Sequence, residues 1–161
     1  MELQPLPFDA HLERYAEQAA RLLATHHAGE REALRIFHQS LPRFLDSEIK
    51  WLARRDLTEA DIRGASLDLD DARLALARWY DFRDWRALAE YAAAVAVDGS
   101  PTQRFEHAVE AVIHGDLAAL EALLRAHPEL TRARSTRVTH FDPSVHRATL
   151  LHSLAANGVE G

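Results

Sequence analysis

The sequence of 161 residues predicts an all-α protein. Apolar residues recur at spacings of three and four along almost every segment, which is the period of one face of a helix. Residues that begin or end helices, mainly Asp, Ser, Gly and Pro, separate these segments. No alternating run of apolar and polar residues is long enough to indicate a strand.

Two helices are predicted at the start of the chain. The first begins after Asp9, whose carboxylate can accept hydrogen bonds from free N–H groups, and ends at Gly29, which adopts positive φ without Cβ strain. The second runs from about Glu30 to Pro42, which ends it. The apolar face of the first consists of Leu12, Tyr15, Ala19, Leu22 and Leu23, and that of the second of Leu34, Phe37 and Leu41.

Two short helices are predicted between residues 47 and 64. Ser47 precedes "EIKWLARR", which fits two turns with Ile49, Trp51 and Leu52 partly inward. Thr58 is followed three residues later by Asp61, the spacing of a capping box, and Gly64 ends this second helix.

A helical hairpin is predicted over residues 67–96. Its first helix follows Asp68, Asp70 and Asp71, acidic residues that favour a helix N-terminus; the glycine and glutamate of a calcium loop are missing. Asp84 caps its second helix. Aromatic residues gather at the break "YDFRD", and we expect the tryptophans to fasten the hairpin to the first helices. The aromatic residues at the break are Trp79, Tyr80, Phe82 and Trp85, and the tryptophans that fasten the hairpin are Trp51, Trp79 and Trp85.

The C-terminal part begins after the linker signal "VDGSPT". We expect an N-terminal helical domain over residues 1–96, a linker over 97–103, and a second helical unit over 104–161. In that unit, one helix runs to about Ile113, the chain turns at Gly115, and a second helix ends before Pro128. Residues 131–145 lack periodicity and predict an exposed loop.

Composition excludes several classes of protein. The absence of cysteine excludes disulfides and thiolate metal sites. No apolar run reaches the roughly 20 residues of a membrane span, and the N-terminus has no secretory-signal pattern, so a cytoplasmic location is expected. The formal net charge of −6 argues against a general nucleic-acid binder, because such binding requires excess cations.

An internal repeat is indicated by the last residues of the chain. Aligning Gly115 on Gly158 places Ala111-Val112 on Leu154-Ala155. The stretch "TLLHSLAANG" resembles the ankyrin signature T-P-L-H-x-A-A-x-x-G, with Leu150 and Leu154 as departures. The matching residues are Thr149, Leu151, His152, Ala155 and Gly158. The glycines at 115 and 158 lie further apart than the ankyrin period of about 33 residues, and the loop 131–145 accounts for the surplus.

The hairpin carries a second resemblance. Residues 69–92 are similar to a helical segment that often precedes ankyrin repeats in bacterial proteins. The matching residues are Ala77, Arg78, Tyr80, Phe82, Trp85 and Leu88. Asp81 stands where glycine is usual, and Asp tolerates positive φ better than most residues.

The resemblance implies a protein–protein interaction module or scaffold without catalysis or cofactor. It also implies structural roles for Thr149 and His152, which bond within the repeat. The residues that we expect to contact a partner protein are Arg132, Arg134, Arg137, His140 and Phe141. Because the second repeat stops at its turn, we expect a fragment, an early stop, or an apolar end that a partner or a second copy covers.

Two other functions remain open from the sequence. A metal-binding or hydrolytic protein could use the C-terminal histidines, although neither an H-E-x-x-H spacing nor a G-x-S-x-G motif occurs. These histidines are His107, His114, His140 and His146. A nucleic acid could contact the Arg-rich loop 131–147, for which no recognised binding fold is present.

Overall fold

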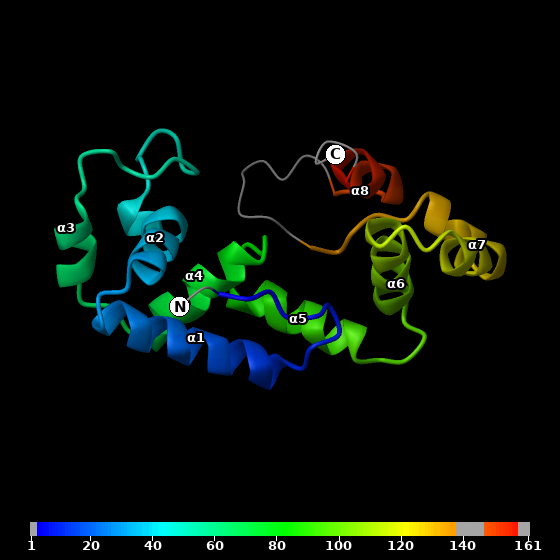
Figure 1. The fold of residues 1–161 in the computed structure, drawn as a ribbon, viewed down its shortest axis with the longest axis horizontal. Coiled ribbons are helices and arrows are strands. Elements are labelled where there is room, and N and C mark those ends of the chain that lie inside the picture. Colours follow the sequence, from blue (N-terminus) through cyan, green and yellow to red (C-terminus); the bar gives the residue numbers. More distant parts are fainter. Residues whose placement is uncertain (1–2, 138–146, 158–161) are drawn as a thin grey trace.

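The computed structural model of the protein describes residues 3–137 and 147–157. Within these ranges the chain forms α-helices and short 3₁₀ helices and no strand, so the predicted all-α class is confirmed (Figure 1). The elements are α1 (Leu12–His27), α2 (Arg31–Ser40), η1 (Pro42–Phe44), α3 (Glu59–Gly64), α4 (Leu69–Trp79), α5 (Trp85–Val95), α6 (Pro101–Ile113), α7 (Leu117–Ala126), η2 (Pro128–Thr131) and α8 (Leu150–Asn157).

The apolar side chains form two separate clusters. The larger one joins α1, α2, α4 and α5 and contains Phe37, Leu76 and Leu88, which are fully buried. The smaller one lies among α6, η2 and α8, with α7 packed against it, and includes Phe105 and Leu130. Figure 1 shows α1 to α5 at one end of the molecule and α6 to α8 at the other. None of the helices in the described ranges is long and apolar enough to cross a membrane.

Three helices end with the same reversal of the chain. The residue after the C-cap has positive φ: 73° at Gly29, 62° at Asp81 and 68° at Gly115. The next N–H then returns to a carbonyl five residues earlier, which is the Schellman arrangement. These bonds are Glu30 N–H to Thr25 O (3.1 Å), Phe82 N–H to Ala77 O (2.8 Å) and Asp116 N–H to Ala111 O (2.8 Å). The left-handed conformation expected for Asp81 is confirmed.

Most helix starts are capped as the sequence indicates. Thr58 and Asp61 form the expected capping box, and Asp84 accepts the N–H of Ala87 at 2.9 Å. The prediction for Asp9 is wrong, because α1 begins at Leu12. Asp9 lies instead in a turn closed by a bond from Ala10 N–H to Pro7 O (3.0 Å).

The predicted helix after Ser47 is absent. Asp46 Oδ1 accepts the N–H groups of Glu48 (2.8 Å) and Ile49 (2.9 Å), which fixes a turn in place of a helix. Trp51 is 58% exposed, so its expected inward position is wrong. Trp79 and Trp85 do pack against the larger cluster.

The predicted linker is shorter than expected. Ser100 accepts the N–H of Gln103 at 3.1 Å and caps α6, whose first residue is Pro101. Residues 101–103 are therefore helical, because a capping serine followed by proline begins a helix.

The left-handed residue Asp81 provides a test of backbone strain. Asp81→Gly should raise the free energy of unfolding by about 1 kcal/mol, because a Cβ is unfavourable at φ 62°. Gly115→Ala should lower the free energy of unfolding by about 1 kcal/mol, because it adds a Cβ to a residue with positive φ. Among the described residues, nothing beyond its chain neighbours lies within 4 Å of that Cβ, so backbone strain alone would account for the loss. Gly64→Ala, at a helical residue with equally open surroundings, is the control and should not destabilise. Urea unfolding measures all three, and similar effects of both alanines would contradict this explanation.

The cap of α5 predicts a pH dependence. The N–H of Ala87 holds the pKa of Asp84 below its ordinary value of 3.8. The carboxylate therefore stabilises the fold above that value and loses its contribution as the pH falls through the lower pKa of the folded state. Asp84→Ala should cost about 1 kcal/mol at neutral pH. Asp84→Asn keeps a hydrogen-bond acceptor but has no charge. The difference in free energy of unfolding between this variant and the wild type should therefore change in acid but not between pH 6 and pH 8.

Candidate functional site: a cleft between the two clusters

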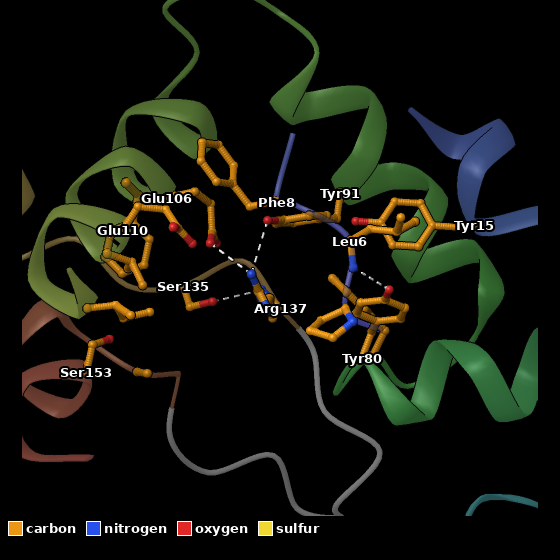
Figure 2. A pocket seen from close by; sticks show the side chains of 16 residues that line it. Leu6, Phe8, Tyr15, Tyr80, Tyr91, Glu106, Glu110, Ser135, Arg137 and Ser153 are labelled. Atoms are coloured by element: carbon orange, nitrogen blue, oxygen red, sulfur yellow. Dashed lines mark hydrogen bonds and ion pairs between the residues drawn. The ribbon is translucent and has the colours of Figure 1, made fainter. Parts of the chain in front are cut away.

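A cleft of about 350 Å³ lies where the two clusters meet (Figure 2). Its walls come from the N-terminal segment 5–8, from α1, from the α4–α5 hairpin, from α6, from the segment around residue 135, and from Ala148 before α8 and Ser153 on α8. Six aromatic side chains line it: Phe8, Tyr15, Tyr80, Phe82, Tyr91 and Phe105. They include all three tyrosines of the chain, so every phenol side chain of the protein belongs to the wall of this cleft.

The N-terminal segment forms one wall because polar side chains fix its backbone. Tyr80 Oη accepts the N–H of Leu6 at 2.8 Å and donates to Gln18 Oε1 at 2.8 Å. Gln18 Nε2 in turn donates to Gln4 O at 2.8 Å. Phe8 contacts the ring of His107 edge-on, with centroids 4.9 Å apart. The segment is therefore bonded to α1 and to the residue that follows α4, and it packs against α6.

The centre of the cleft holds an ion pair. Arg137 Nη2 lies 3.0 Å from Glu106 Oε2 and donates to Tyr91 Oη at 3.3 Å. The guanidinium carbon lies 5.2 Å from the centre of the Tyr91 ring and 5.9 Å from that of Phe82, within the range of cation–π attraction. The Glu106 side chain is only 3% exposed, whereas that of Arg137 is 36% exposed.

The segment that carries Arg137 is held at a second point. Ser135 N–H donates to Ala148 O at 2.7 Å, and Ser135 Oγ accepts the N–H of Arg137 at 3.1 Å. Figure 2 shows Ser135 and Arg137 entering the cleft from this segment. Part of the predicted exposed loop 131–145 is thus packed against the helices: Ser135 is buried and Arg137 is partly buried.

The electrostatics of the cleft follow from burial and from this pair. Burial raises the pKa of Tyr15 to about 12 and also raises the pKa of Tyr80 and of Tyr91. Burial is the largest single influence on Arg137 and lowers its pKa, but the charges of Glu106 and Tyr91 and the hydrogen bonds to both together outweigh burial, so the net pKa shift is upward. A buried carboxylate left without its cation typically costs about 3–5 kcal/mol.

Of the residues expected to contact a partner, the structure describes Arg132, Arg134 and Arg137. Arg132 and Arg134 are exposed, and Arg134 Nη1 donates to Arg147 O at 3.1 Å. Arg137 has its ion-pair partner within the chain, on α6. His140 and Phe141 lie outside the described residues.

The predicted repeat residues that the structure describes lie at the start of α8, along α8, and at the turn between α6 and α7. His152 Nδ1 accepts the N–H of Thr149 at 3.2 Å and lies 2.8 Å from its hydroxyl, at the start of α8. Gly115 occupies the turn between α6 and α7. Leu151 and Ala155 are exposed on α8, and Gly158 lies outside the described residues.

The histidines show no metal geometry where they are described. His107 contacts Phe8, and His114 Nδ1 lies 2.9 Å from Glu110 O. Within residues 3–137 and 147–157, no three His, Asp or Glu side chains are grouped to hold a metal ion. His140 and His146 are outside these ranges.

Glu106 is the central residue that the sequence analysis did not single out. It lies on α6 beside Phe105 and pairs with a residue 31 positions later. One signal was present: an acidic residue next to the apolar face of a helix requires a partner when that face is buried. The sequence offers no spacing that identifies Arg137 as this partner.

Comparisons of this chain with protein-family models, with curated proteins and with solved structures gave no match. The chemistry of the cleft and of the exposed surfaces is therefore the basis for assigning a function.

The ion pair predicts unequal roles for the arginines of this region. Arg137→Ala should lower the free energy of unfolding by about 2 kcal/mol, because Glu106 loses its cation; the partial exposure of Arg137 reduces the effect below that of a fully buried pair. Arg132→Ala, at an exposed position five residues away, should change it by less than about 0.5 kcal/mol. Urea unfolding at neutral pH compares the two, and equal effects would argue against the pair.

The raised pKa values of the tyrosines predict how the stability of the fold changes at alkaline pH. Their pKa values are raised in the folded protein above the ordinary 10.0, so the folded state holds these protons more tightly than the unfolded chain does. The resulting stability is complete below pH 10 and is lost as the pH rises toward about 12, the pKa of Tyr15. Tyrosinate absorbance should therefore appear together with loss of helical circular dichroism. A tyrosine that titrates near pH 10 in the folded protein would contradict the packing of the cleft.

Proposed function

We propose that this chain is a protein-binding module that binds its partner through the exposed apolar face of α8. Leu151 is 72% exposed and Leu154 is 58% exposed, and both project from one short helix. Large apolar side chains grouped on a surface are typical of an interaction site. This exposure is the observation that carries the proposal.

The internal repeat indicates what kind of surface would cover α8. In the alignment of Gly115 with Gly158, Leu151 corresponds to Ala108 and Leu154 to Ala111. Both alanines are buried on α6, where Ala108 packs in a cluster with leucines of α7. Two positions that are exposed on α8 thus correspond to two positions that are buried on α6. The fitting partner is a helix with leucines at spacings of three and four, as in α7.

An ankyrin-like arrangement is part of this proposal. It is supported by the helix pair α6–α7 with a left-handed glycine between its members, by the packing of α8 on α6, and by the contact between Thr149 and His152. In such an arrangement Thr149 and His152 shape the start of the helix, and the neighbouring surfaces bind proteins. No catalytic step and no cofactor are assigned.

Substitution on α8 tests the proposal. Leu151→Glu with Leu154→Glu should reduce the amount of partner captured from an extract of the source cells at least about tenfold, because both leucines would lose their buried contacts. Val97→Glu, which places the same charge at a position 60% exposed and away from α8, is the control and should capture as much as wild type. Quantitative mass spectrometry measures both.

Sedimentation velocity distinguishes a partner that is a different protein from a partner that is a second copy of this chain. A dimer of the wild type that is lost in the double variant would mean self-association through α8. Equal capture by wild type and double variant, together with a monomeric wild type, would refute binding through this face.

A further inference from the structure

We propose that the cleft is a receptor for an alkylguanidinium group, occupied here by Arg137, and that it accepts the arginine side chain of another polypeptide in exchange. The guanidinium contacts lie between α5 and α6, and although Ser153 of α8 lines the cleft, the exposed Leu151 and Leu154 do not. The inference therefore does not depend on the proposed function.

The groups around Arg137 match the chemistry of a guanidinium. A carboxylate oxygen of Glu106 and the phenol oxygen of Tyr91 both accept from Nη2, and the rings of Tyr91 and Phe82 face the cation. A guanidinium is planar, weakly hydrated and able to bind a carboxylate and an aromatic face together. An ammonium ion offers the charge without the plane, so the site should prefer arginine to lysine.

The receptor is built from residues that do not belong to the segment it binds. Glu106 lies on α6 and Tyr91 on α5, while Phe82 follows α4, and all three residues are at most 4% exposed. Arg137 reaches them from the segment that follows η2 (Figure 2). A preformed site on helices and a ligand on a connecting segment are the two parts that an exchange requires.

The burial of Glu106 dictates which molecules can displace Arg137. An acidic partner that withdrew Arg137 would leave a carboxylate buried without a cation, which is strongly unfavourable. A second guanidinium that entered as Arg137 left would keep the charge balanced. The cleft of about 350 Å³ beside Arg137, and the partial exposure of that side chain, give an incoming arginine a route. Binding would release residues 132–137 from the helices.

Chemical rescue tests the receptor. Arg137→Ala removes the ligand, and N-ethylguanidinium supplies the atoms that the substitution deletes. At ten times its dissociation constant the compound should raise the melting temperature of Arg137→Ala by about 3 °C. n-Butylammonium, with the same charge and no plane, should have less than half this effect. The double variant Arg137→Ala with Glu106→Gln should not respond to either.

The exchange is tested with a peptide. Acetyl-Gly-Arg-Gly-amide should bind Arg137→Ala by calorimetry at least about tenfold more tightly than wild type, in which Arg137 competes as an intramolecular ligand. The citrulline peptide, which has the same shape without the charge, should not bind. If Arg137→Ala is unfolded, N-ethylguanidinium should restore its helical circular dichroism.

Three results would overturn the proposal. The first is no response of Arg137→Ala, folded or unfolded, to N-ethylguanidinium. The second is an equal response of the variant that also carries Glu106→Gln. The third is peptide binding that is absent or is as tight in wild type as in Arg137→Ala, because Arg137 would then not be the group displaced.

Discussion

The burial of the Glu106 carboxylate is the constraint around which the centre of this molecule is organised. A carboxylate that is 3% exposed needs a cation and polar partners, and the chain supplies Arg137 from residues 132–137, which are not helical. The same guanidinium contacts Tyr91 of α5. One ion pair therefore joins α5 of the larger cluster, α6 of the smaller cluster and the segment after η2.

Local signals explain why most helices could be predicted from the sequence. The capping residues Thr58 and Asp84 act on N–H groups three residues away, and the turn glycines act on their own backbone. The failure after Ser47 has a local cause as well. Asp46 binds two successive N–H groups and fixes a turn, a competition between side chain and helix that periodicity does not reveal.

The cleft could not be predicted because its contacts are distant in the sequence. Glu106 and Arg137 are 31 residues apart and follow no helical spacing, and Leu6 is bonded to Tyr80 over 74 residues. The composition of the loop around Arg137 suggested a solvated surface, and burial of its arginine depends on where α5 and α6 happen to meet. Periodicity shows which face of a helix is apolar, but it does not show which charged side chain from another segment contacts that face.

The bond between Leu6 and Tyr80 has a consequence for biosynthesis. Leu6 is translated before its hydrogen-bond partner Tyr80, which follows it by 74 residues. Until then Leu6 and Phe8 have no place to pack, and the nascent chain presents them to solvent or to a chaperone. The segment of residues 4–8 therefore cannot reach its native position until the α4–α5 hairpin has been synthesised.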